Sequence, residues 1–412
     1  MPERLFPHRL RRPVPRVSDE KRVRGWGASP AGTEDARGML GPCGIRALLE
    51  RTVVAALVSL PPPLQRLLAG GPVRIDGLEL DPSMQLILRL VRLSGRRGLD
   101  TMTPAEARDE IRRNAAAFAG VVSPVARIDA TAVPGPAGAI PARLYVPAKG
   151  ARRRRRGLLV YYHGGGWVVG DLDTHDPVCR FFAREADVTV LAVEYRRAPE
   201  HPFPAAVDDA LVAARWAARE ADSLGIDPAC LAVAGDSAGG NLAAVVAQRA
   251  TREGGPRLAA QLLIYPVTDV SRKHPSYSLF RDGFFLTEAE MDWYRGHYLP
   301  DDAAARDPRA SPLLAPDLRG LPPAMVLTAG FDVLRDEGEA YARRMEEAGV
   351  RVSLRRQAGL IHGFCNATAV SRPALAAMRE AARWLAAELS RGDYRAGAAG
   401  VGAPLAAHRK RM

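Results

Sequence analysis

The chain has 412 residues, of which 47% are hydrophobic and 25% charged. That composition is typical of a folded globular protein, and the length allows a large core with extra layers. The longest apolar runs fall well short of the ~18 residues of a membrane-spanning helix, which argues against a transmembrane protein. The four cysteines lie far apart without a CxxC pair, so they indicate neither a zinc module nor a disulfide scaffold and favour a reducing, cytoplasmic location.

The net charge of +12 is concentrated in three short segments: residues 1–38, the arginines at 152–156 and the basic residues at 409–411. No aromatic-interleaved basic patch and no groove-reading motif accompanies these charges. We therefore expect solvated appendages and no specific nucleic-acid binding. The run at 152–156 falls between two expected strands and is interpreted as a loop.

The two ends of the chain have no sustained apolar period. Residues 1–40, rich in Arg, Pro and Gly, are predicted to form a disordered basic extension, and residues 393–412 a disordered tail. The Arg11-Arg12 pair lacks the apolar segment of an export signal. Since ordered sequence is expected from about residue 43, Met39 is a hypothetical natural start.

Residues 41–120 predict a helical cap region ahead of any sheet. Leu86, Leu90 and Leu93 recur at helical spacing, and residues 103–106 place a threonine cap, a proline and an acid at the start of another helix. No strand signal occurs in this region. It is either a packed helical layer or a lid over a site.

Residues 121–392 alternate between strand and helix patterns and predict a catalytic α/β domain. Strands are expected at 126–133, 140–146, 158–162, 188–195, 230–234, 259–264, 324–329 and 352–356. Helices are expected from about 177 and at 204–223, 238–253, 334–348 and 373–390. This alternation predicts a mostly parallel central sheet with helices on both faces, and reactive residues at the carboxyl ends of its strands.

The sequence GDSAGG at 235–240 places Ser237 on a sharp turn between a strand and a helix. Such a turn exposes the serine hydroxyl as a nucleophile, and the helix N-terminus stabilises a developing oxyanion. The alternative interpretation is a glycine-rich turn with an N-cap serine. The sequence HGGGW at 163–167 follows another strand, so we expect Gly164, Gly165 and Ala238 to form an oxyanion hole and His163 to support the loop.

The remaining members of a catalytic triad follow from chain order, which in this architecture is serine, acid, histidine. Asp332 comes after the strand at 324–329, and His362 comes after the last strand. The competing acids Asp336, Glu337 and Glu339 are expected in the solvated first turns of the next helix. His362 would take the proton of Ser237 while Asp332 orients the imidazole. This chemistry needs no metal or organic cofactor.

These residues resemble the hormone-sensitive-lipase-like branch of the α/β-hydrolases, in its GDSAG subgroup. The motifs are HGGGW at 163–167, YRRAPEHPFPA at 195–205, GDSAGGN at 235–241, DVLRDE at 332–337 and HGF at 362–364. The resemblance implies an α/β-hydrolase fold and a carboxylesterase for short- to medium-chain acyl esters, with the cap shaping the acyl pocket. Two residues depart from the family pattern: Val333 replaces a usual proline and Arg197 a usual leucine.

Three other functions share this pattern. Related plant receptors kept the fold but lost the histidine, which is present here as His362. Arylacetamide deacetylases cleave amides with the same triad, and only substrate profiling separates the two activities. Lipase action at a lipid surface is disfavoured, because residues 1–38 contain no amphipathic helix with a basic face. The sequence leaves a homodimer open.

Overall fold

The computed structural model describes residues 56–57, 60–95, 97–118, 123–148 and 156–399. All of them belong to one structural unit, Leu49–Met412. The extension predicted at 1–40 and residues 152–155 of the arginine run lie outside the described residues. No helix in the described ranges combines the length and the apolar character of a membrane span.

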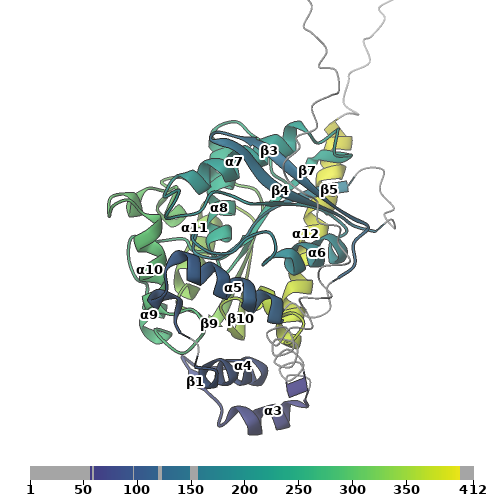
Figure 1. Cartoon of the computed structure of the whole chain (residues 1–412). Helices are drawn as coiled ribbons and strands as arrows, with labels where there is room; N and C mark the ends of the chain where they lie inside the picture. Colours follow the sequence, from purple (N-terminus) through teal and green to yellow (C-terminus); the bar gives the residue numbers. More distant parts are fainter. Residues whose placement is uncertain (1–55, 58–59, 96, 119–122, 149–155, 400–412) are drawn as a thin grey trace, which may run out of the picture. The chain divides into compact units, whose positions relative to one another are not determined.

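An eight-stranded sheet forms the centre of the molecule, in the order β10-β9-β8-β7-β5-β6-β4-β3 (Figure 1). The strands are β3 (Arg127–Gly135), β4 (Gly138–Val146), β5 (Arg156–Tyr162), β6 (Thr189–Val193), β7 (Ile226–Asp236), β8 (Ala260–Ile264), β9 (Ala324–Phe331) and β10 (Val352–Ile361). Strands β5 to β10 pair in parallel, whereas β3 and β4 pair antiparallel at one edge. The predicted α/β-hydrolase class with a mostly parallel sheet is confirmed.

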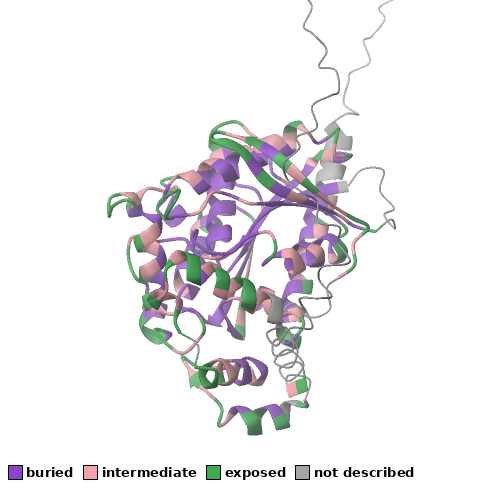
Figure 2. Cartoon of the chain, in the orientation of Figure 1, coloured by how far each residue is buried: buried purple, intermediate pink, exposed green. Residues whose placement is uncertain are grey.

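Helices cover both faces of this sheet. Helices α7 (Ala205–Arg219), α8 (Ala238–Arg252) and α11 (Arg335–Glu347) pack on one face, and α6 (Asp176–Glu185) and α12 (Arg372–Ala399) on the other. Every residue of β6, β8 and β9 is buried, as Figure 2 shows for the centre of the sheet. Strands covered on both faces have continuous apolar sequences, which is why the pattern located them.

Helix α12 differs from its expected length. It continues to Ala399, so the first part of the tail predicted at 393–412 is helical, and residues 400–412 lie outside the described residues. Alanine and arginine are strong helix formers and continue the helix past residue 392 despite the glycine at 397.

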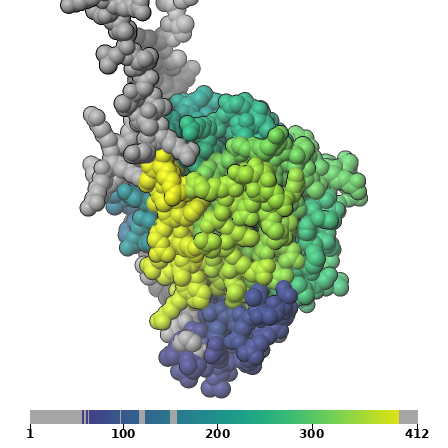
Figure 3. Space-filling model, turned by 180° about the vertical axis from the view of Figure 1, so that it is seen from behind, coloured from purple at the N-terminus to yellow at the C-terminus, as the bar shows by residue number. Residues whose placement is uncertain are grey.

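The N-terminal region contains α3 (Pro62–Ala69), α4 (Pro82–Leu93), the short 3₁₀ helix η1 (Leu99–Thr101) and α5 (Pro104–Phe118). The cap expected before α5 is present: the Glu106 carboxylate accepts hydrogen bonds from the amide and the hydroxyl of Thr103, both at 2.8 Å. Part of this region lies against the C-terminal half of the domain (Figure 3), where the amide of Asp81, at the start of α4, donates to the carbonyl of Gly359.

The expectation that no strand precedes residue 127 is wrong. A hairpin joins β1 (Arg74–Ile75) and β2 (Leu78–Glu79). Asp76 and Gly77 form its turn with φ of 54° and 72°, the left-handed pair of a type I′ turn. Strands of two residues are too short to show alternation, and the Asp-Gly pair was the only signal.

A second departure is the segment between β8 and β9, where no helix was expected. It contains α9 (Pro275–Leu279), α10 (Glu288–Tyr298) and the 3₁₀ helices η2 (Ala304–Arg306) and η3 (Pro312–Leu314). Thr287 and Glu290 start α10 with a reciprocal capping box. Helix α10 packs against η1, so two segments far apart in sequence meet beside the carboxyl ends of the strands.

Candidate active site

Ser237 lies at the junction between β7 and α8 in a strained backbone conformation, with φ of 55° and ψ of −120°. The chain can turn so sharply only because its neighbours are glycines. A Cβ on Gly239 would lie 1.9 Å from the carbonyl oxygen of Tyr162, and one on Gly235 would lie 2.3 Å from the backbone of Gly239. The strain is therefore held by close backbone packing around the serine.

The structure brings Ser237, His362 and Asp332 together in one hydrogen-bonded chain. The Nε2 atom of His362 is 3.0 Å from the Oγ of Ser237, and its Nδ1 is 2.8 Å from the Oδ2 of Asp332. All three side chains are buried. This geometry suits a proton on Nδ1 donated to Asp332, with Nε2 facing the serine hydroxyl as an acceptor.

The loop that carries Asp332 is fixed although Val333 replaces the usual proline. The Oδ1 of Asp332 accepts a hydrogen bond from the amide of Leu334 at 3.0 Å. The carbonyl of Val333 accepts one from the hydroxyl of Ser276 at 2.5 Å, and the Val333 side chain is fully buried. These contacts hold the loop where a proline ring would have restricted φ.

The geometry differs from the prediction at Gly164. Its amide donates to the Oδ1 of Asp236 at 3.0 Å, so it does not point to a position beside Ser237 as an unpaired donor. Gly165 and Gly166 follow with φ of 119° and 56°. Among the described residues, no backbone carbonyl accepts from either of these two amides. Ala238 opens α8, where its N–H has no intrahelical partner.

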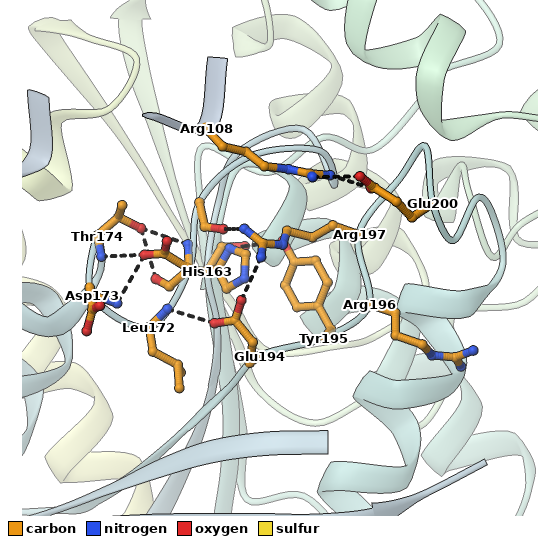
Figure 4. A network of polar contacts seen from close by, with 12 residues as sticks. Arg108, His163, Leu172, Asp173, Thr174, Glu194, Tyr195, Arg196, Arg197 and Glu200 are labelled. Atoms are coloured by element: carbon orange, nitrogen blue, oxygen red, sulfur yellow. Dashed lines mark hydrogen bonds and ion pairs between the residues drawn. The ribbon is translucent and has the colours of Figure 1, made fainter. Parts of the chain in front are cut away.

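His163 lies below this glycine loop and does not contact the serine. Its Nδ1 is 2.8 Å from the carbonyl of Gly164. Its ring stacks on Tyr195 at 4.2 Å, and the Tyr195 hydroxyl donates to the backbone carbonyl of His163 (Figure 4). Burial lowers the pKa of His163 to about 3, so the ring is neutral. These contacts suit the supporting position expected for it.

Sequence reasoning missed the pair formed by His175 and Asp236. The Asp236 carboxylate accepts from the hydroxyl of Tyr161 at 2.7 Å and lies 3.3 Å from the Nε2 of His175. Burial opposes charge on both groups, but each stabilises the other: Asp236 raises the pKa of His175, and His175 lowers that of Asp236. A carboxylate directly before the nucleophile was the signal that could have indicated this tie to the glycine loop.

The positive charge of Arg197 lies next to a carboxylate of the same segment. Its guanidinium lies 3.1 Å from the carboxylate of Glu194 and donates to the carbonyl of Gly170 (Figure 4). Glu194 also accepts from the amide of Leu172 at 2.9 Å, and burial raises the pKa of this carboxyl. The arginine therefore fits the loop because two nearby acceptors satisfy it.

A cavity of about 420 Å³ opens onto Ser237 and His362. Both the N-terminal helices and the segment between β8 and β9 contribute apolar side chains to its wall. Among these are Met84, Ile87, Ile111, Leu286, Met291 and Tyr294. The arrangement can hold an apolar group next to a nucleophile with its base and unpaired amide donors, which suits acyl transfer.

Comparison with known proteins agrees with this arrangement. Residues 159–366 match the family described as alpha/beta hydrolase fold. The carboxylic ester hydrolase LipN of Mycobacterium tuberculosis is 47% identical over 82% of this chain and 91% of its own length. The ethyl acetate hydrolase of Pseudomonas putida is 39% identical over 70% of this chain and 92% of its own.

Solved structures give the same assignment. An alpha/beta hydrolase enzyme from the metagenome of Lake Arreo superposes with a TM-score of 0.73 at 43% identity, covering 76% of this chain and 99% of its own. The esterase of Pyrobaculum calidifontis gives 0.71 at 39% identity, covering 75% and 98%. The chain therefore belongs to the α/β-hydrolase fold family, among its hormone-sensitive-lipase-like carboxylic ester hydrolases.

Proposed function

We propose that this enzyme hydrolyses short- to medium-chain acyl esters through a covalent acyl-serine intermediate. The observation that carries the proposal is the hydrogen-bonded chain from Ser237 through His362 to Asp332 at the base of a largely apolar cavity. The same arrangement of serine, histidine and acid performs acyl transfer on unrelated folds, because the chemistry depends on the geometry of the three side chains.

Each step moves one proton through His362. In acylation, Nε2 takes the proton of Ser237 as Oγ attacks the ester carbonyl, and the imidazolium then protonates the departing alkoxide. In deacylation, Nε2 takes a proton from water, whose oxygen attacks the acyl-serine, and returns the proton to Ser237 as the acid leaves. Asp332 stays ionised and stabilises the imidazolium in both steps.

The negative oxygen of the tetrahedral intermediate is assigned to the amides of Gly165, Gly166 and Ala238. Gly164, expected among these donors, is replaced by Gly166 because Asp236 already accepts its N–H. A free amide donor aimed at such an oxygen is worth about 10²- to 10³-fold in rate.

The acyl group is assigned to the apolar cavity. Its volume of about 420 Å³ lies within the usual range for small-molecule sites. Relatives named ethyl acetate hydrolase and arylesterase support small ester substrates.

The test is turnover of p-nitrophenyl acetate, butyrate and octanoate by the wild type and by Ser237→Ala. We expect the wild type to be active and the variant to lose roughly 10⁵-fold or more, with its circular dichroism unchanged. Acyl p-nitroanilides run in parallel separate ester from amide cleavage. A wild type that is inert on all these esters, or a Ser237→Ala variant that keeps its activity, would refute the proposal.

A further inference from the structure

An arginine of helix α5, in the N-terminal region, contacts the glycine loop of the catalytic domain. The Nε atom of Arg108 donates to the carbonyl of Val168, and one terminal nitrogen donates to the carbonyl of Ala198, both at 2.8 Å. The guanidinium also holds the carboxylate of Glu200 with two bonds of 2.8 and 2.6 Å (Figure 4). One side chain therefore joins α5 to two separate loops of the catalytic domain.

The first of these two carbonyls, that of Val168, belongs to the turn that carries the assigned oxyanion donors. The amides of Val168 and Val169 donate to the carbonyl of Gly165 at 3.0 and 2.9 Å. Ala198, the second carbonyl contact of Arg108, donates its own amide to the carbonyl of Trp167 at 2.9 Å. A displacement of Arg108 would thus release the outer side of the turn formed by residues 165–169.

One helical turn further on, Arg112 contacts the other end of the same loop. Its Nε lies 2.6 Å from the Oδ2 of Asp171, whose Oδ1 accepts from the amide of Thr174 at 2.9 Å. The Thr174 hydroxyl is 2.9 Å from the Nδ1 of His175. Spacing of four residues puts both arginines on one face of α5.

The Arg108 guanidinium is mostly buried against the two carbonyls, whereas its partner Glu200 is 55% exposed. The Arg108 side chain is only 16% exposed, and its hydrogen bond lowers the pKa of Glu200 to about 2. Hydrogen bonds from a charged fork are about twice as strong as neutral ones and fix direction. Arg113 on the same helix provides a contrast, since its own side chain is 66% exposed and its ion pair is with Glu110 of the same helix.

We propose that Arg108 is a positioning residue for the oxyanion-binding loop, so that α5 stays docked on the catalytic domain during turnover and supports the loop from behind. The inference rests on the proposed esterase function. Arg108 touches neither substrate nor reacting atoms, and it acts by holding the amides of residues 165 and 166 in place.

The experiment compares Arg108→Ala, the control Arg113→Ala and Ser237→Ala. For Arg108→Ala we expect kcat to fall by ~10- to 100-fold, a loss typical of small misplacements of catalytic groups, with KM nearly unchanged. The factor should be the same for p-nitrophenyl acetate and hexanoate, because the oxyanion is common to both. The rate of Ser237 phosphonylation by a p-nitrophenyl alkylphosphonate, followed by p-nitrophenolate release, should fall in parallel.

The outcomes separate the two proposals. If Ser237→Ala is inactive but Arg108→Ala behaves like Arg113→Ala, the positioning role is wrong and the esterase function stands. If the loss depends on acyl length or appears in KM, Arg108 shapes the pocket and the inference also fails. If Ser237→Ala stays active, the proposed function itself fails. Should Arg108→Ala not fold, Arg108→Lys, which keeps the charge without the fork, must show the same length-independent loss of kcat.

Discussion

Glu337 on α11 is a buried carboxyl group whose surroundings favour its neutral form. Its Oε1 accepts from the amides of Thr268 and Asp269 at 2.7 and 3.2 Å, while its Oε2 has no hydrogen-bond partner among the described residues. Burial raises the pKa of Glu337 well above its usual range. The expectation that it lies in a solvated helix turn is wrong, and so is that for Glu339, which is buried beside Arg356.

This burial makes stability depend on pH. A carboxyl with a raised folded-state pKa binds more protons when folded than when unfolded, once the pH exceeds the unfolded value of about 4.3. The free energy of unfolding therefore falls as the pH rises above that value, until the folded-state pKa is passed. We expect Glu337→Gln to remove this pH dependence. Between pH 5 and pH 8, the free energy of unfolding of the variant should rise relative to that of the wild type by about 1 kcal/mol or more.

Urea unfolding at the two pH values measures the difference. Glu339→Gln on the same helix is the matched control, because Glu339 accepts two 2.6 Å bonds from Arg356. It should lose stability at pH 8. Equal effects of Glu337→Gln at both pH values would contradict the assigned ionisation.

The β7–α8 junction shows how two elements set one reactive side chain. Helix α8 approaches β5 so closely that Gly239 has no room for a side chain. Its neighbour Gly240 is less restricted, because a Cβ there would lie 3.0 Å from the ring of Pro266. The turn between β7 and α8 thus depends on Gly239 much more than on Gly240.

Gly239→Ala should lower the free energy of unfolding by about 3 kcal/mol or more, because backbone carbonyls block the methyl group. Esterase activity should fall with it, since relief of the clash moves α8 and Ser237. Gly240→Ala is the control and should cost clearly less. Urea denaturation and kcat of both variants provide the test, and equal costs would refute the packing argument.

Helices and strands with a strong hydrophobic period could be predicted from the sequence. The contacts that their side chains make with other elements could not. The buried strands and the turn around Ser237 appear in the sequence as apolar runs and glycine positions. The hairpin at Asp76-Gly77 and the helices between β8 and β9 were missed because their signals span few residues. The contact of the Gly164 N–H could not be predicted, because its partner Asp236 ends strand β7 and becomes a neighbour only in the folded sheet.

At the scale of the whole molecule, the cavity joins three stretches of chain. Helices α4 and α5, the triad loops, and the segment before and within α10 all contribute side chains to its lining. Tyr294 packs against the glycine loop, because a Cβ on Gly166 would lie 2.2 Å from its ring. We therefore expect acyl preference to depend on segments outside the β-sheet.

Tyr294→Ala should enlarge the cavity and favour longer acyl groups. Each methylene that gains apolar contact is worth ~0.8 kcal/mol, or about fourfold in kcat/KM. We expect the octanoate-to-acetate ratio of kcat/KM to rise by about 10-fold or more. Tyr298→Phe, on the same helix but outside the cavity wall, controls for disturbance of α10. An unchanged ratio in Tyr294→Ala would show that this wall does not contact the acyl chain.

The order of the triad along the chain has a consequence for biosynthesis. His362 lies 125 residues after Ser237, so at ~5–20 residues per second a ribosome adds it roughly 6 to 25 s later. The amide of Asp81, near the start of α4, must wait for the carbonyl of Gly359 before it is paired. On the proposed mechanism, a nascent chain released before β10 holds the serine without its base, so we expect hydrolytic activity only from chains whose translation has run past His362.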